Sequence, residues 1–117
     1  MELVAFLGED EENWGQVTGL LNHGEWEKAI IIKTKSALKY SHPKITETVI
    51  VDSTKPLTEL KEIITKEMKN KLSGFDANVS IASGNGKEHM ALISALLSVP
   101  VGIRLVVFTK KGIEWVN

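Results

Sequence analysis

Val79-Ser-Ile-Ala-Ser-Gly-Asn-Gly-Lys-Glu-His-Met90 is the stretch of sequence that decides the fold. Its beginning belongs to residues 78–82, where polar and apolar side chains alternate with a period of two, which is typical of a β-strand. The glycine loop 83–86 follows, and from Lys87 to Val99 apolar residues occupy nearly every face of a helix. The stretch therefore predicts a strand, a tight loop and a helix that is covered on both sides.

The rest of the chain alternates between short apolar runs and amphipathic segments. Apolar runs without polar alternation are typical of strands that a parallel sheet buries on both faces, and they span residues 3–7, 29–32 and 49–51. Helical spacing of apolar side chains predicts helices over about 12–23 and from Pro56 to Leu72. The connection 33–46 is expected to be irregular. Residues 103–108 and 113–116, separated by Lys110-Lys-Gly112, predict a closing hairpin.

The order of these elements defines the expected fold class. Strands and helices alternate as β-α-β-β-α-β-α-β-β, which predicts an α/β protein. We expect a three-layer Rossmann-like sandwich with a mostly parallel six-stranded sheet that ends in a C-terminal β-hairpin. A length of 117 residues is near the usual size of one domain, so residues 1–117 are expected to form a single domain.

The composition excludes several classes of function. There is no cysteine, which excludes a disulfide framework, a thiolate metal site and cysteine catalysis. Fourteen basic and fifteen acidic side chains give a net charge of −1, so no global positive field is expected to hold duplex DNA. No apolar run approaches the ~18 residues of a membrane span, and no basic start of a secretory signal is present. We expect a cytoplasmic protein with no membrane partner.

The loops after two of the strands are the expected ligand site. Ligands of open α/β sheets bind beyond the carboxyl ends of the strands, where the strand order reverses. If the strands 3–7 and 78–82 flank that point, Gly8-Glu-Asp10 faces Ser83-Gly-Asn-Gly-Lys87. The second loop precedes a helix N-terminus, whose N–H groups and dipole favour an anion, and Lys87 adds a full charge. This chemistry suits phosphate.

Neither of two common phosphate-binding motifs matches the loop. A Walker A loop needs glycine where Ile81 stands and serine or threonine where Glu88 stands. The dinucleotide fingerprint needs glycine where His89 stands. A glycine turn with a purely geometric role is the alternative interpretation.

Residues 78–97 resemble the signature segment of CARF domains, the CRISPR-associated Rossmann fold family. In that family a strand carrying an asparagine runs into a Thr/Ser-Gly-Gly-Thr/Asn-Lys-like loop and then into a helix rich in methionine and alanine. The order of elements over the whole chain is similar as well. The resemblance implies a homodimer that binds a cyclic oligoadenylate across its two-fold axis in CRISPR-linked antiviral signalling. The candidate ligand-binding residues are Gly8, Asn78, Ser83, Gly84, Asn85, Gly86 and Lys87.

Three functions follow as hypotheses. The first is a stand-alone CARF-like sensor. The second is a metal-independent ring nuclease that cleaves cyclic tetraadenylate, with Lys87 and His89 as candidate catalytic residues, although the loop after the first strand has no serine or threonine before Thr18. The third is a dimerisation or protein-interaction domain without a ligand, because the carboxylates of Glu9-Asp-Glu-Glu12 would oppose a polyphosphate unless they point away.

The remaining polar and aromatic residues have simpler interpretations. No histidine and carboxylate pair has metal-ligand spacing, so neither a metal nor a cofactor is expected. The acidic run 9–12 is expected to be solvated, and so are the clustered lysines. Lys33, Thr34 and Lys35 end the second strand on the ligand side. The three tryptophans, Trp14, Trp26 and Trp115, are expected in the core or an interface. Gly15 and Gly19, four positions apart in the expected helix 12–23, would allow a close packing partner there.

Overall fold

The computed structural model describes residues 1–117 and contains a six-stranded mixed sheet and three α-helices. The strands are β1 (Glu2–Leu7), β2 (Lys28–Thr34), β3 (Glu47–Val51), β4 (Asp76–Ser80), β5 (Gly102–Thr109) and β6 (Gly112–Trp115). The helices are α1 (Trp14–His23), α2 (Leu57–Lys71) and α3 (Gly86–Leu97). Short 3₁₀ turns lie at Glu11–Asn13 and Lys35–Ala37. None of the helices has the length and apolar character that crossing a lipid bilayer requires.

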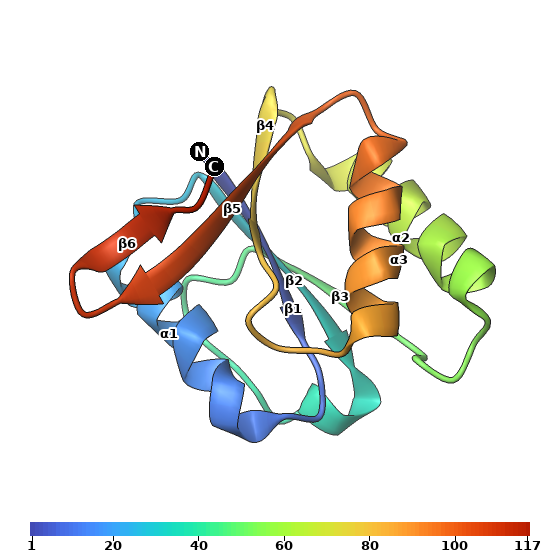
Figure 1. Ribbon diagram of the computed structural model, residues 1–117, viewed down its shortest axis with the longest axis horizontal. Coiled ribbons are helices and arrows are strands. Elements are labelled where there is room, and N and C mark those ends of the chain that lie inside the picture. The colour runs from blue at the N-terminus through green and yellow to red at the C-terminus, as the bar shows by residue number, and fades with distance from the viewer.

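The strand order is β3-β2-β1-β4-β5-β6, so the chain builds the sheet outward from its middle in two directions (Figure 1). The first five strands pair in parallel, and β6 pairs with β5 antiparallel as the closing hairpin. The order reverses between β1 and β4. The prediction that these two strands flank the reversal point is therefore confirmed.

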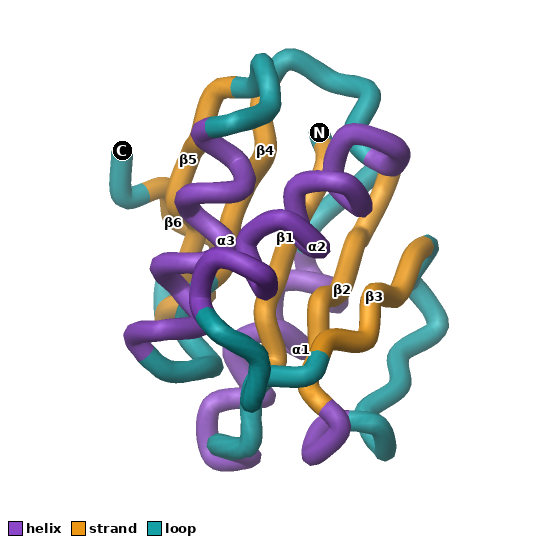
Figure 2. The backbone as a smooth tube through the Cα atoms, turned by 90° about the vertical axis from the view of Figure 1, so that its right-hand side faces the viewer, coloured by secondary structure: helices purple, strands orange, loops and turns teal.

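The two faces of β1 enter two different hydrophobic clusters. Val4 and Phe6 point into a cluster with α2 and α3, whereas Leu3, Ala5 and Leu7 point into a cluster with α1. Figure 2 shows α2 and α3 in front of the strands and α1 behind them. Because both faces are covered, all five side chains are fully buried, which explains the uninterrupted apolar run.

Helix α2 has one buried stripe and one charged face. Leu60, Ile64 and Met68 recur at helical spacing and are fully buried. Glu59 lies in the first turn and Lys69 in the last, which complements the helix dipole. The predicted amphipathic helix is confirmed.

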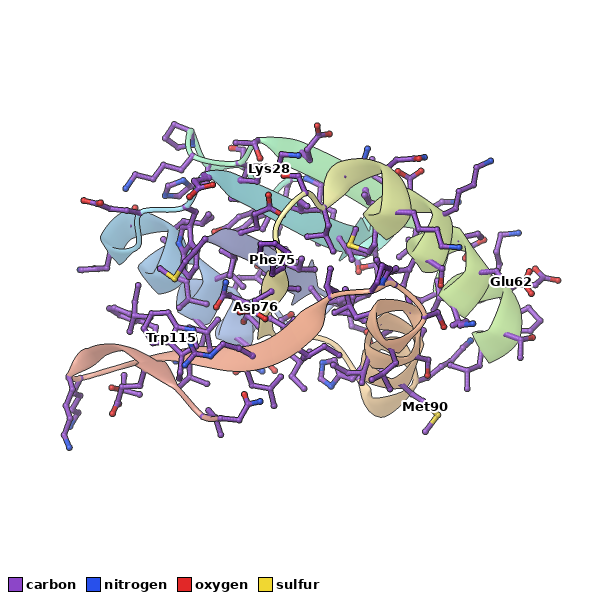
Figure 3. All side chains as sticks on the ribbon, turned by 90° about the horizontal axis from the view of Figure 1, so that it is seen from above. Lys28, Glu62, Phe75, Asp76, Met90 and Trp115 are labelled. Atoms are coloured by element: carbon purple, nitrogen blue, oxygen red, sulfur yellow. The ribbon has the colours of Figure 1, made fainter.

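Helix α3 buries one face and exposes apolar side chains on the other. Ala91, Leu92, Ala95 and Leu96 are fully buried against the core, but Met90 is 58% and Leu97 73% exposed. Met90 projects away from the body of the molecule (Figure 3). The prediction that this helix is covered on both sides is wrong for a single chain, because apolar composition alone does not say which faces have a partner.

Several predicted boundaries and contacts need correction. Lys33 and Thr34 extend β2, so the connection after it is shorter than the predicted 33–46 and starts with a 3₁₀ turn. Helix α3 ends at Leu97 rather than residue 99, because the next two N–H groups bond to carbonyls three residues back.

The two glycines of α1 have different surroundings. A Cβ on Gly19 would overlap the ring of Phe108, which packs directly on the helix backbone there. A Cβ on Gly15 would meet nothing within 4 Å, so no close packing partner accounts for glycine at that position.

Candidate functional site

A polar cleft opens at the carboxyl ends of the parallel strands, beside the point where β1 and β4 lie next to each other. Its volume is about 130 Å³, and four different connections contribute to it: those after β1, β2 and β3, and the start of α3. The lining residues are Glu9, Thr34, Ser36, Ser53, Asn85 and Glu88. Hydroxyl, amide and carboxylate groups therefore converge where a ligand of an open α/β sheet is expected.

Three larger hollows lie elsewhere on the surface. One of about 310 Å³ lies along the lysines of α2, one of about 270 Å³ at the amino ends of β1 and β4, and one of about 370 Å³ beside Trp26. None is formed by loops at the carboxyl ends of the parallel strands. We therefore take the smaller cleft as the candidate site, on the topological argument rather than on size.

Asp10 joins the loop after β1 to the loop after β4. Its Oδ1 atom accepts hydrogen bonds from Ser83 Oγ at 2.8 Å and from the Gly84 N–H at 2.9 Å, and its Oδ2 atom accepts one from Asn13 Nδ2 at 2.8 Å. Ser83 Oγ in turn accepts a hydrogen bond from the Gly8 N–H at 2.9 Å. The prediction that the two loops face each other is confirmed, but the expectation that the whole acidic run is solvated is wrong for Asp10.

The electrostatic environment of Asp10 favours its charged form. Burial by itself would raise the pKa of this carboxyl, but the hydrogen bonds from Asn13, Gly84 and Ser83 outweigh that effect. The pKa of Asp10 therefore lies below its ordinary value of 3.8. The carboxylate is a fixed negative charge within the loop that the sequence assigned to an anion.

A second carboxylate, Glu88, fixes the start of α3. Glu88 Oε1 accepts from the Asn85 N–H at 2.8 Å, and the Glu88 N–H donates to Asn85 Oδ1 at 2.9 Å, which forms a capping box. The Ser53 hydroxyl donates to Glu88 Oε2. The N–H groups of Gly86 and Lys87, in contrast, have no acceptor within the protein. Two donors at this helix start thus stay available to a ligand.

The backbone at the two loops is packed too closely for larger residues. Gly84 has a φ of +104°, and a Cβ on it would lie 2.9 Å from both Phe6 Cδ1 and His89 Nε2. A Cβ on Gly8 would lie 2.9 Å from the Gly84 Cα. Glycine is required at both positions for contact between the loops.

The candidate catalytic residues each bond to a backbone carbonyl. Lys87 is exposed, and its Nζ atom donates to the Ser53 carbonyl at 2.8 Å. His89 Nε2 lies 2.7 Å from the Ser83 carbonyl, which can only accept, so Nε2 donates in this hydrogen bond. Both side chains lie beside the glycine loop. Their contacts orient them at the start of α3.

Asn78 lies apart from the other candidate residues. Its amide donates to the Glu2 carbonyl at 3.0 Å and accepts from Trp115 Nε1 at 2.8 Å. The side chain is 2% exposed and borders the hollow at the amino ends of the strands rather than the cleft. The structure thus brings together Gly8, Ser83, Gly84, Asn85, Gly86 and Lys87 but not Asn78.

Of the residues at the end of β2, one lines the cleft and another points away from it. Thr34 lines the cleft and shares a hydrogen bond of 2.6 Å with Ser36. Lys33 is buried and donates to the carbonyls of Leu38 and Tyr40, away from the cleft. The sequence placed Asp10 in the facing loop without assigning its side chain a role, and Ser36, Ser53 and Glu88 were missed as parts of the site. Only Glu88 had a readable signal, the Asn-x-x-Glu spacing of a capping box.

No group of three or more histidine or carboxylate side chains is placed to hold a metal ion. No protein-family model matches the sequence, and no curated protein matches it either.

Proposed function

We propose that this chain is a Rossmann-like domain of the CARF type that binds a cyclic oligoadenylate as a homodimer in CRISPR-linked defence signalling. The observation that supports a nucleotide ligand is the polar cleft at the reversal point between β1 and β4. The likeness of residues 78–97 to the signature segment of CARF domains supports the identity of the ligand.

The donors and acceptors around the cleft suit different parts of a nucleotide. The hydroxyls of Thr34 and Ser36 and the carboxylate of Glu9 can bond to ribose hydroxyls and to an amino group of a base. The unpaired N–H groups of Gly86 and Lys87, with the Lys87 ammonium, can bond to a phosphate. A nucleotide would thus lie with its phosphate at the start of α3 and its sugar over the cleft.

The size of the cleft supports a dimer. A volume of about 130 Å³ is well below the roughly 300 Å³ at which ordinary small-molecule pockets begin. A ring of four nucleotides therefore needs more than one copy of the cleft, and a two-fold axis would supply a second one.

The outer face of α3 supports the same dimer. Met90 and Leu97 are seven positions apart on one side of the helix and largely exposed, and the half-buried Ile93 lies between them. Exposed apolar side chains at this spacing suit an interface between helices. This stripe starts one turn after the glycine loop, so a dimer in which two α3 helices pack in parallel through it would bring the two loops near each other.

The binding proposal is tested by titrating the purified protein with cyclic tetraadenylate. We expect saturable binding that Lys87→Ala weakens by about tenfold, because a charge-assisted contact to phosphate is lost. Lys110→Ala, in the exposed turn before β6, is the matched control and should bind as wild type does. Absent binding, or equal binding by the wild type and Lys87→Ala, overturns the assignment of the pocket.

The same mixture distinguishes a sensor from a ring nuclease. After prolonged incubation a sensor leaves the ring intact, whereas a nuclease yields linear fragments that chromatography separates from it. Because the loop after β1 has no serine or threonine before Thr18 to position a ribose, we expect the ring to remain intact.

The exposed stripe of α3 also favours a second candidate function, a dimerisation or protein-interaction domain without a ligand. Sedimentation of the wild type, of Leu97→Ser and of Ile63→Ser tests the interface. We expect a dimer that Leu97→Ser dissociates and that Ile63→Ser, at an exposed apolar position of α2, leaves intact. A monomeric wild type contradicts both functions that use a dimer. A dimer that binds no cyclic oligoadenylate favours the second candidate.

A further inference from the structure

We propose that Asp10 is a tethered anion that occupies the inner donors of the glycine loop and thereby selects against ligands that bring only one phosphate. This inference rests on the proposed function. It assigns to Asp10 the role of a specificity-determining residue at that site.

The position of the Asp10 carboxylate is the one that a phosphate oxygen would take at such a loop. One oxygen accepts both from Ser83 Oγ and from the Gly84 N–H, at 2.8 and 2.9 Å. A glycine loop before a helix normally offers these groups to an anionic ligand. Here a side chain of the same chain has taken them.

The segment that carries Asp10 is itself held in place. The Asn13 N–H donates to the Asp10 carbonyl at 3.0 Å, and the Asn13 side chain donates to the Asp10 carboxylate. Trp14 Nε1 donates to the Gly8 carbonyl at 2.9 Å. The carboxylate is therefore fixed from both sides of its loop, and it competes with a free anion without losing much conformational entropy.

The inner and outer donors of the loop differ in what they can still bind. The Ser83, Gly84 and Asn85 donors are taken by Asp10 and Glu88, whereas the N–H groups of Gly86 and Lys87 have no partner. A phosphate at the outer donors would lie near two fixed carboxylates. It would be repelled unless other contacts of the same ligand compensate.

This arrangement discriminates by the number of phosphates in the ligand. A tethered group acts at an effective concentration that reaches the millimolar range or more, so a free mononucleotide or inorganic phosphate at millimolar concentration competes poorly with it. A ring that two protomers hold at several points presents its next phosphate at a similarly high local concentration. The site would thus ignore the common cellular monophosphates and respond to a multivalent ligand.

The role of Asp10 is tested by calorimetric titration of inorganic phosphate and, separately, of cyclic tetraadenylate. The variants are Asp10→Ala, Asp10→Asn and Glu12→Gln, each checked for a cooperative melt. Glu12→Gln is the matched control, because it removes one negative charge from the same acidic run at an exposed position outside the cleft and does not touch Ser83 or Gly84. We expect Asp10→Ala to bind inorganic phosphate at least about tenfold more tightly than the wild type, Asp10→Asn by a smaller factor, and Glu12→Gln within about twofold.

Two results overturn the role of Asp10: a folded Asp10→Ala that binds phosphate no better than the wild type, or a gain in Glu12→Gln equal to that in Asp10→Ala. If Asp10→Ala does not fold, the comparison is made with Asp10→Asn, and a gain no larger than that of Glu12→Gln overturns the proposal. A different result decides the proposed function. A protein that binds no cyclic tetraadenylate but gains phosphate affinity in Asp10→Ala loses the proposed ligand and keeps the role of Asp10.

Discussion

The two ends of β4 are fastened to β1 in the same way but serve different purposes. At the amino end, Glu2 of β1 accepts from the Ser73 and Gly74 N–H groups at 2.9 and 3.2 Å and from Ser73 Oγ at 2.5 Å. At the carboxyl end, Asp10 accepts from Ser83 Oγ and the Gly84 N–H. In both places one carboxylate satisfies a serine and the following glycine.

The backbones that the two carboxylates hold are different. Gly84 has a positive φ and close neighbours, whereas Gly74 does not, since a Cβ there would meet nothing nearer than 3.6 Å. Only the carboxyl end leads directly into a helix start with unpaired N–H groups. The comparison indicates that a carboxylate stabilises the fold at the amino end of β4, and we propose that the equivalent contact at the carboxyl end also controls what the loop can bind.

The largest expected effect on stability comes from replacing the glycine at each end of β4 with alanine. Gly84→Ala should lower the free energy of unfolding by about 3 kcal/mol, because it combines a left-handed φ with overlap against Phe6 and His89. Gly74→Ala should change it by less than about 1 kcal/mol. Urea denaturation measures the free energy of unfolding of both variants. Similar decreases would show that the backbone is packed equally closely at Gly74 and Gly84.

Removing each carboxylate is expected to have a smaller effect on stability. Glu2→Ala and Asp10→Ala should each lower the free energy of unfolding by about 2 kcal/mol, because each leaves two or three donors without their charged acceptor. Only Asp10→Ala should also gain affinity for inorganic phosphate. A gain of that affinity in Glu2→Ala would remove the distinction between the two ends.

Low pH should weaken the hydrogen bonds of both carboxylates, Glu2 and Asp10. Burial would raise the pKa of Glu2, but hydrogen bonds from Ser73 and Gly74 and the nearby Lys28 amine outweigh it, so the pKa lies below its ordinary value of 4.5. That of Asp10, which lies close to Glu88, is below 3.8. Each charged carboxylate therefore stabilises the fold above its ordinary pKa, and this stabilisation is lost as the pH falls through that value towards the lower folded one.

Urea denaturation from about pH 7 to about pH 3 checks the acid effect. The free energy of unfolding should fall below about pH 5, and Glu2→Gln or Asp10→Asn should each make the fall less steep. A wild-type stability that does not change over this range would contradict the assigned contribution of both groups.

The smallest effect is expected at the last residue of β4. Ser80 is 1% exposed, and its hydroxyl has no hydrogen-bond partner. Ser80→Ala should therefore leave the stability unchanged or raise it by up to about 1 kcal/mol, since a buried unpaired hydroxyl is removed. Thermal melting measures the change, and a loss above about 1 kcal/mol would show that Ser80 has a partner in solution.

Much of the fold could be predicted because it depends on local periodicity. The apolar run of β1, the amphipathic pattern of α2 and the glycine that closes the hairpin turn Lys110-Lys-Gly112 each specify an element without long-range information. The element order then limited the topology enough to place β1 beside β4. The exposed face of α3 was missed because apolar content does not reveal which side of a helix another element covers.

The sequence predicted that the loops after β1 and β4 face each other, but not the electrostatics of their contact. The sequence places four acidic residues in a row at 9–12, and nothing local distinguishes Asp10 from its neighbours. The orientation of Asp10 depends on the register of β1 against β4, which pairs Ala5 with Ser80. This register brings Asp10 within reach of Ser83 and Gly84, which lie more than seventy positions later in the chain. Such a contact follows from the whole sheet and not from a motif.

The late position of β4 in the chain has a consequence for folding. β1 and β2 can pair as soon as both are synthesised, but the other edge of β1 must wait for β4, which lies beyond β3 and α2 in the chain. Until then an apolar strand presents an unpaired edge, the kind of surface on which chains aggregate. Pairing across so large a sequence separation is slow. We therefore expect the hydrogen bonds of Glu2 and Asp10 to form late in folding, when β4 pairs with β1 and completes the sheet.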